Sequence, residues 1–181
     1  EGLKAMSENI TEAYIDDINY RLYGSQPANE LGFTTNVTEI SDDGTIFKDN
    51  NIEVIAFKNA HGDFKNSFGF LFITNDKRIL FSGDTAVSNN LMKYGKNLDI
   101  LVHEVFSSET FLNKTKDWQI YHQAHHTSSI DLGIIADELQ PKKLVLSHIL
   151  FWGASEESLL KDIKKNFSGQ AVIAKDLMVI K

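Results

Sequence analysis

Residues 80–85 have the sequence Leu-Phe-Ser-Gly-Asp-Thr, in which an apolar run ends at a glycine and a carboxylate follows at once. Glycine lets the backbone bend sharply, so a strand over 78–82 would present Asp84 at its carboxyl end. The two oxygens of a carboxylate in that place can bind two cations. Gly-Asp-Thr is also a common turn sequence, so this motif alone favours the metal-binding and the turn interpretations about equally.

Two further strand candidates precede this motif. Residues 52–57 and 67–74 are rich in apolar and β-branched residues, and the polar turn 75–77 joins the second run to 78–82. Short turns between neighbouring runs are typical of antiparallel strands. The three runs therefore predict an antiparallel meander that leads into Asp84.

The N-terminal part of the chain predicts less regular structure. Apolar residues four positions apart in 8–22 predict one helix within residues 1–24. Residues 25–51 are rich in Asn, Asp, Ser and Gly. This composition predicts a loop, with weak strands at 37–40 and 45–47.

Downstream of Asp84, the patterns of strands and helices alternate. Residues 90–94 predict a short helix, 98–102 a strand buried on both faces, and 106–127 a long polar loop of the kind that binds or covers a ligand. The remaining pattern predicts a helix, a strand, a helix and two strands, in the order 128–139, 143–147, 155–166, 171–174 and 177–180. Strands with interleaved helices indicate an α/β fold in which helices pack outside sheets.

Composition narrows the functional classes. The chain has 181 residues, 42% of them hydrophobic, which is enough for a sizeable core, and it has no apolar run long enough to cross a membrane. It contains no cysteine, so any metal must be held by His, Asp or Glu. A formal charge of −7 argues against a broad nucleic-acid surface. Because the chain starts at Glu1 rather than Met, we expect its natural start upstream, and the compartment is open between cytoplasm and periplasm.

Polar side chains stand at the ends of other predicted strands. The strand 143–147 leads into His148, and His61, which a glycine follows, comes just after an earlier strand. In the pair His103-Glu104, the period of two in a strand sends the side chains to opposite faces, and we favour Glu104 for the site. Each of these residues could instead be a surface residue or a strand cap. Side chains at strand ends can nevertheless converge on one edge of a sheet.

Three more histidines, His122, His125 and His126, stand just before the predicted helix 128–139. For His122 and His125, an exposed polar loop is at least as good an interpretation as a functional role. Aromatic residues in 106–127 and after His148 could cover a small substrate, or they could be ordinary packing, and we give the two interpretations similar weight. These aromatic residues are Phe106, Phe111, Trp118, Tyr121, Phe151 and Trp152.

Five motifs occur in a recognisable order. His61-Gly, Phe-Ser-Gly-Asp84-Thr, His-Glu104-Val-Phe, His126-Thr-Ser and Leu-Ser-His148 follow one another along the chain. Together they resemble the metallo-β-lactamase superfamily, and within it the branch that contains ribonuclease Z and the arylsulfatase-like hydrolases. Five motifs in register are far more specific than any one of them.

The resemblance implies a role for each of the five residues. His61 would be a ligand of a first zinc ion, Asp84 would bridge two zinc ions, and His148 would be a ligand of the second. His126 would assist proton transfer, and Glu104 would orient its ring. At Glu104 the chain reads His-Glu-Val-Phe where ribonuclease Z has His-Glu-Ala-Thr.

The resemblance also implies a fold and an incomplete site. We expect the C-terminal part of an αββα four-layer sandwich, as a single partial domain over 1–181 in which 52–181 carries the metal-site half. The family motif His-x-His-x-Asp-His, which supplies two ligands to each metal, does not occur in the 181 residues. A catalytic zinc ion usually needs three protein ligands. We therefore expect a C-terminal fragment that is inactive by itself.

For the intact protein, we expect a metal-dependent hydrolase. Water activated between two divalent cations, Zn in the first place, would attack a phosphate, sulfate or related ester. The acidic composition favours a small ester over RNA. One alternative is a non-catalytic metallo-β-lactamase-like module used for binding or assembly. Another is a site completed in trans by a complementing N-terminal half on another chain. A homo-oligomer is a further partner that we consider.

Overall fold

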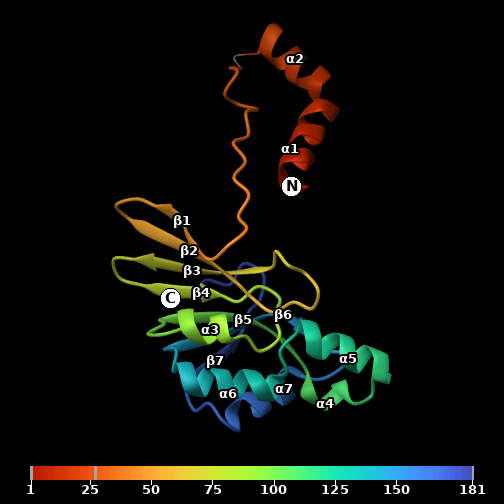
Figure 1. The fold of residues 1–181 in the computed structure, drawn as a ribbon, viewed down its shortest axis with the longest axis vertical. Helices are drawn as coiled ribbons and strands as arrows, with labels where there is room; N and C mark the ends of the chain where they lie inside the picture. The colour runs from red at the N-terminus through yellow and green to blue at the C-terminus, as the bar shows by residue number, and fades with distance from the viewer. Residues whose placement is uncertain (1, 27, 181) are drawn as a thin grey trace. The chain divides into compact units, whose positions relative to one another are not determined.

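The chain divides into two compact units. A computed structural model describes residues 2–26 and 28–180 (Figure 1). Contacts gather within Glu1–Ser41 and within Asp42–Lys181. The single domain over 1–181 stays a prediction. Among the residues described, no helix is long and apolar enough to span a bilayer.

The first unit contains two helices, α1 (Gly2–Ala13) and α2 (Ile15–Tyr23). The prediction of one helix over 8–22 is wrong, because Tyr14, with φ −106° and ψ 12°, leaves helical geometry between the two. The weak strand predicted at 37–40 does not form either. The regular structure of this unit is therefore confined to its first half.

The second unit is built on one seven-stranded sheet, in which the strands lie in their order along the chain. Strands β1 to β4 are antiparallel neighbours, and strands β4 to β7 are parallel neighbours. The strands are β1 (Gly44–Lys48), β2 (Ile52–Lys58), β3 (Phe68–Thr74), β4 (Arg78–Phe81), β5 (Ile100–Phe106), β6 (Lys143–Leu150) and β7 (Gln170–Ile173). The predicted meander is confirmed as β2 to β4, and the weak strand at 45–47 is β1.

Helices make the crossovers that parallel strands require. Helix α3 connects β4 to β5, α4 to α6 connect β5 to β6, and α7 connects β6 to β7. The helices are α3 (Asn89–Tyr94), α4 (Ser108–Phe111), α5 (Lys116–His125), α6 (Ser129–Leu139) and α7 (Glu156–Lys164). The predicted mixed α/β class is thereby confirmed. The loop predicted over 106–127 is wrong, because α4 and α5 lie within it.

The core includes side chains of the sheet, antiparallel strands among them, and of helices α3, α6 and α7. Helices α6 and α7 run side by side (Figure 1). Leu101 and Leu144 of the strands and Leu132 of α6 are completely buried. Burial of each such side chain stabilises the fold by about 1.5–3 kcal/mol. Gly133 brings the two helices into close contact, because a Cβ atom there would lie only 2.9 Å from the carbonyl oxygen of Ile163.

Strand β6 carries a bulge at His148, the residue that the sequence analysis placed just after this strand. Glu104 pairs with Ser147 and Val105 pairs with Ile149, so His148 is the extra residue between two ladder pairs. His148 has φ 41°, which is uncommon outside glycine. Because a bulge changes the direction of a side chain, His148 leaves the ladder at the edge of the sheet where β4 also ends.

Strand β7 is the last strand of the sheet. The strand predicted at 177–180 does not form, because the chain turns before it. The backbone N–H of Met178 donates a hydrogen bond to the carbonyl oxygen of Lys175 at 3.0 Å. Leu177, inside this turn, has φ 63° and directs the chain away from an extended conformation.

Candidate metal centre

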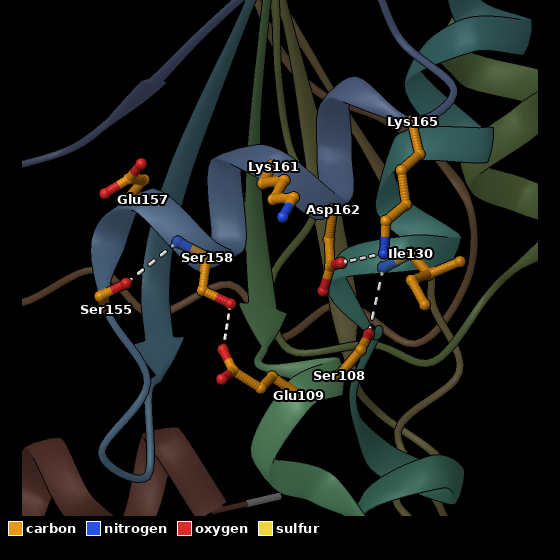
Figure 2. A pocket seen from close by; sticks show the side chains of 9 residues that line it. All are labelled: Ser108, Glu109, Ile130, Ser155, Glu157, Ser158, Lys161, Asp162 and Lys165. Atoms are coloured by element: carbon orange, nitrogen blue, oxygen red, sulfur yellow. Dashed lines mark hydrogen bonds and ion pairs between the residues drawn. The ribbon is translucent and has the colours of Figure 1, made fainter.

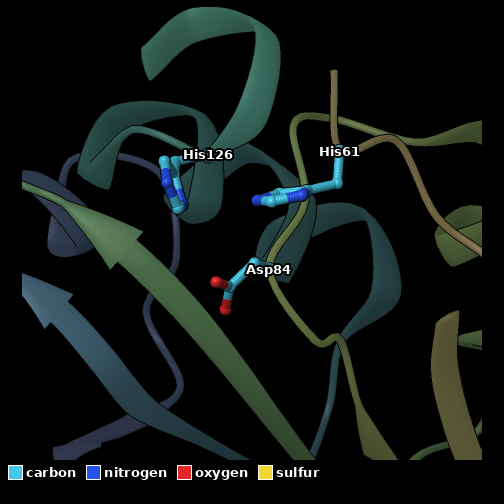
Figure 3. Close-up of side chains that lie close together, drawn as sticks. All are labelled: His61, Asp84 and His126. Atoms are coloured by element: carbon cyan, nitrogen blue, oxygen red, sulfur yellow. The ribbon is translucent and has the colours of Figure 1, made fainter. Parts of the chain in front are cut away.

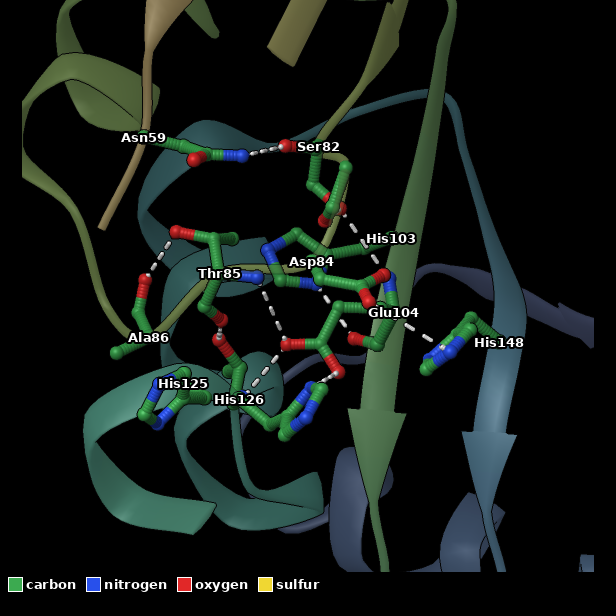
Figure 4. Close-up of polar contacts among 12 residues, drawn as sticks. Asn59, Ser82, Asp84, Thr85, Ala86, His103, Glu104, His125, His126 and His148 are labelled. Atoms are coloured by element: carbon green, nitrogen blue, oxygen red, sulfur yellow. Dashed lines mark hydrogen bonds and ion pairs between the residues drawn. The ribbon is translucent and has the colours of Figure 1, made fainter. Parts of the chain in front are cut away.

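Asp84 follows β4 at a sharp bend. Gly83 has φ 61°, and a Cβ atom there would lie 2.6 Å from the carbonyl oxygen of Phe68, so a side chain at this position would be both strained and crowded. The bend leaves the Asp84 carboxylate partly exposed, and its Oδ2 lies 3.6 Å from Nε2 of His148. The carboxylate is therefore directed to the carboxyl ends of β5 and β6 (Figure 4).

His61 reaches the same place from the segment after β2. The backbone N–H of Gly62 donates a hydrogen bond to the carbonyl oxygen of Ala124 in α5 at 2.8 Å, which fixes this segment against the helix. The His61 ring lies edge-on to two other rings, with centroids 4.9 Å from His125 and 5.6 Å from His126. His61 thus stands beside the helix that leads to His126.

Glu104 of β5 connects two loops of the site (Figure 4). Its side chain is only 2% exposed. Its Oε1 accepts hydrogen bonds from the backbone N–H groups of Thr127 at 2.7 Å and Thr85 at 3.4 Å. Its Oε2 lies 3.3 Å from Nδ1 of His126. Glu104 therefore holds the loop that carries Asp84 and the loop that carries His126 at fixed positions.

His103, the neighbour of Glu104, is fully buried. Its Nδ1 lies 2.6 Å from the carbonyl oxygen of Glu104, and burial lowers the pKa of its imidazole. Among the residues described, His103 belongs to neither of the groups that could hold a metal ion. Of this pair, only Glu104 contributes a side chain to the site.

The five candidate residues converge as two groups of metal-binding atoms. Atoms of His61, Asp84 and His126 lie within 4.8 Å of one another (Figure 3), and so do atoms of Glu104, His126 and His148. His126 belongs to both groups, and its ring stacks on that of His148 with centroids 5.8 Å apart. The structure thus brings together all the site residues that the sequence predicted.

The two central histidines titrate differently. Burial lowers the pKa of His61, and the nearby His125 adds to this effect against the opposing influence of Asp84. His61 is therefore neutral near pH 7, which is the form that binds metals. Burial also lowers the pKa of His126, but the carboxylates of Glu104 and Asp84 outweigh it, and the pKa is raised overall. His126 is the better proton carrier of the two.

The site has the donors that a divalent cation requires. Nδ1 of His126 and Oε2 of Glu104 lie 3.3 Å from each other on the buried side of the site. The partly buried His61 imidazole and Asp84 carboxylate offer further donor atoms within 4.8 Å of a His126 nitrogen. Imidazole and carboxylate groups together suit divalent metals, zinc among them. The residues present therefore fit a divalent metal ion.

Sequence reasoning gave too little weight to α5 and to the segment after β6. The ring centroid of His122 lies 5.8 Å from that of His126 and 4.5 Å from that of Trp152. His125 contacts His61, as described above. Both histidines lie four residues after an aromatic residue of 106–127, and this spacing would have indicated a functional helix face if the segment had been read as helical.

A cavity of about 460 Å³ adjoins His126. Its wall is largely apolar. Besides His126, its lining residues come from the loop after β4, the end of β5, helices α4 and α5, and the start of α6. The apolar residues that line it are Ala86, Val87, Phe106, Phe111, Leu112 and Ile130. A substrate group bound in this cavity would lie next to the His126 imidazole.

A second cavity, of about 530 Å³, lies among residues of α4, α6 and α7 (Figure 2). Several polar groups at its wall bond to one another. Lys165 Nζ lies 2.6 Å from Asp162 Oδ1, and Ser158 donates a hydrogen bond to Glu109. The Ser158–Glu109 bond connects α7 to α4, and the Lys165–Asp162 pair lies at the end of α7 itself. We therefore assign a structural role to the residues of this cavity.

Comparison with known proteins gives a consistent result. No family model matches the chain. It is 30% identical over 103 residues to ribonuclease Z of Archaeoglobus fulgidus, which covers 56% of this chain and 31% of that protein. It is 32% identical over 98 residues to ribonuclease Z of Sulfolobus acidocaldarius, which covers 54% and 31%. The chain thus spans about a third of the length of these curated relatives.

Solved structures support the same fold. The metallo-β-lactamase fold protein YhfI from Bacillus subtilis matches with a TM-score of 0.59 and 22% identity, over 71% of this chain and 49% of that one. The short form of human tRNase Z matches with a TM-score of 0.54 and 22% identity, over 78% and 46%. The chain is a metallo-β-lactamase-fold protein. Its sequence is similar to those of ribonucleases Z, which agrees with the resemblance seen in the order of its motifs.

Proposed function

We propose that the chain forms part of a metal-dependent phosphodiesterase site that acts on RNA. The observation that carries this proposal is the pair of metal-binding groups that share His126 at one edge of the sheet. Similarity to ribonuclease Z supports phosphodiester chemistry over a sulfate ester. It also favours RNA over the small ester that the acidic composition predicts.

In this proposal three residues hold divalent metal. His61 and His148 would each be a ligand of one ion, and Asp84, which lies between them, would contact both. Once bound, the cations would act as Lewis acids and lower the pKa of a bound water molecule. We propose zinc because imidazole and carboxylate donors suit it. The site has no thiolate, since the chain has no cysteine.

His126 would supply the proton for the leaving oxygen. The carboxylates of Glu104 and Asp84 raise its pKa and so favour the protonated ring, and Glu104 holds the ring from the buried side. The apolar cavity beside His126 would receive the leaving group and exclude water from it. A positioned general acid typically accelerates hydrolysis by about 10²–10⁴.

The proposal predicts that, in the site completed by a polypeptide that carries a His-x-His-x-Asp-His motif, Asp84→Asn removes metal-dependent hydrolysis and lowers the bound metal. The amide keeps the size of the side chain but loses the negative charge that would lie between two cations. We would measure zinc content and hydrolysis of bis(4-nitrophenyl) phosphate with added Zn²⁺ or Mn²⁺, and compare 4-nitrophenyl sulfate as the substrate of the alternative ester class. Asp63→Asn is the matched control, because this exposed carboxylate lies in the loop next to His61.

The results separate the competing functions. If Asp84→Asn retained hydrolysis, Asp84 would be a turn residue and not a metal ligand. A chain that binds no zinc and hydrolyses neither ester, even with a second polypeptide that carries a His-x-His-x-Asp-His motif, would favour the non-catalytic module. Activity that appears only with that second polypeptide would support completion in trans. Tight binding of two zinc ions and full activity by the chain alone would contradict the incomplete site.

A further inference from the structure

Helix α5 presents aromatic residues to solvent next to the metal centre. None of its ten residues is buried, and Trp118 and Tyr121 are 55% and 43% exposed. Each stacks on the histidine four positions later. The Trp118 and His122 ring centroids are 5.6 Å apart with 24° between the planes, and those of Tyr121 and His125 are 4.2 Å apart with 21°.

The histidine of each pair lies next to a residue of the proposed metal site. The His122 ring lies 5.8 Å from His126, and the His125 ring lies 4.9 Å from His61. At a helical rise of about 1.5 Å per residue, Trp118 stands roughly 12 Å along the helix from His126. The aromatic surface is therefore continuous from solvent to the residues that would meet the scissile bond.

Trp152 extends this surface from the other side of His122. Its ring lies 4.5 Å from the His122 ring, and the ammonium group of Lys114 lies 4.3 Å from its centroid. Trp152 has φ 47°, a strained conformation for a bulky residue. Strain of this kind persists where the surrounding structure imposes it, which is common at functional sites.

We propose that these rings form an aromatic platform that stacks a nucleobase next to the scissile phosphate. The platform consists of Trp118, Tyr121, His122, His125 and Trp152. The inference rests on the proposed function and narrows its substrate to RNA that is single-stranded at the cleavage point, because a base inside a duplex has both faces covered. Aromatic side chains recognise unstacked bases in this way.

The charge beside the platform fits the same ligand. Lys114 places a positive charge over Trp152, where the phosphate that follows a stacked base could reach it. The chain as a whole is acidic, with a formal charge of −7, so contact with the polyanion must be local. Stacking, which does not depend on charge, is the interaction that an acidic protein can offer an RNA strand.

The test compares two single-stranded oligomers of equal length, oligoadenylate and an abasic ribose-phosphate chain. Binding is measured by fluorescence anisotropy of labelled oligomers with the full 181-residue chain in EDTA, so that no hydrolysis occurs. We expect Trp118→Ala to weaken oligoadenylate binding about 5- to 150-fold, from the free energy of stacking one base. Binding of the abasic oligomer should not change.

Two matched variants make the test specific. Trp118→Phe keeps a stacking face and should restore most of the affinity. Ile120→Ala removes an apolar residue of the same helix that is 68% exposed, and it should leave the affinity for oligoadenylate unchanged. Equal affinity of the wild type for the two oligomers would overturn the proposal. An equal loss of affinity for oligoadenylate in Trp118→Ala and Ile120→Ala would overturn it too.

Failure of the platform and failure of the proposed function give different results. Wild-type hydrolysis together with base-independent binding would overturn the platform alone. Base-dependent binding that Trp118→Ala abolishes would support the platform. If the same protein showed no metal-dependent hydrolysis even with a second polypeptide that carries a His-x-His-x-Asp-His motif, the phosphodiesterase would be contradicted.

Discussion

A single glycine determines how closely the His61 segment approaches α5. Gly62 has φ 55°, and a Cβ atom there would lie 2.0 Å from Nε2 of His125. The same residue donates its N–H to the carbonyl oxygen of Ala124. Close approach at Gly62 is therefore what lets His61 and His125 stand side by side at the metal centre.

We predict that Gly62→Ala weakens zinc binding and destabilises the fold. The left-handed conformation costs a residue with a side chain roughly 1–2 kcal/mol. The new methyl group must also displace the His125 ring and with it the contact to His61. The free energy of unfolding from urea titration and the zinc affinity from competition with a chelator would measure the two effects separately.

Gly153→Ala is the control for backbone strain alone. Gly153 also has a positive φ, 93°, but a Cβ atom there would meet no atom within 4 Å. This variant should lose stability without a change in zinc affinity. If both alanine variants bound zinc like the wild type, the contact between Gly62 and His125 would not position His61.

Among the elements, α6 fixes the loop that carries His126. Its N-cap is Ser128, whose hydroxyl accepts a hydrogen bond from the N–H of Asp131 at 3.0 Å. The residue before it, Thr127, donates its N–H to Glu104. The start of α6 is therefore bonded both to its own first turn and to β5, which leaves His126 little freedom to move.

We predict that Ser128→Ala lowers the free energy of unfolding by about 1 kcal/mol, because an N–H of the first turn loses its acceptor. Thermal or urea unfolding followed by circular dichroism would measure this loss. Thr115→Ala is the matched control, since Thr115 is the N-cap of α5 but its side chain makes no capping hydrogen bond. A control loss as large as that of Ser128→Ala would contradict the role of the cap.

The sequence predicts the elements whose apolar pattern reflects burial. The runs that became β2, β3 and β4 and the helices α6 and α7 all contribute side chains to the core, so their periodicity is visible in the sequence. Helix α5 buries none of its residues, and its apolar residues follow a functional face instead. Its segment, 106–127, was accordingly misread as a loop.

The same reason explains which residues of the candidate site the sequence could predict. Asp84, Glu104, His61 and His148 follow or end recognisable strands, and the resemblance to a known family added the role of His126. The bulge at His148 depends on the register between β5 and β6, which no property of the single strand reveals. The contribution of α5 depends on contacts between residues far apart in the chain, which a local pattern cannot show.

For the whole chain, the net negative charge opposes the binding of RNA, whereas the proposed site favours it. A formal charge of −7 repels an RNA strand at long range. In the proposed function, RNA binding would then depend on contacts that form at short range, which the metal centre and the aromatic platform would supply. Cations held near Asp84 and Glu104 would also reverse the local charge of the site.

The second compact unit should fold by itself. Residues 42–181 contain all seven strands and every residue assigned here to the metal centre. Its first residues belong to the sheet unit, because Asp43 accepts hydrogen bonds from the N–H of Lys58 at 2.7 Å and from the side chains of Asn90 and Tyr94 at 3.2 and 3.3 Å.

We predict that a chain of residues 42–181 unfolds in one cooperative transition and binds zinc as the full chain does, because its core is complete. Asp43→Ala in this shortened chain should lower the free energy of unfolding by about 1 kcal/mol, through lost hydrogen bonds to an exposed carboxylate. Urea unfolding followed by circular dichroism and zinc competition would measure both properties. A gradual transition, or zinc binding that requires residues 1–41, would show that the first unit contributes to the fold or to the site.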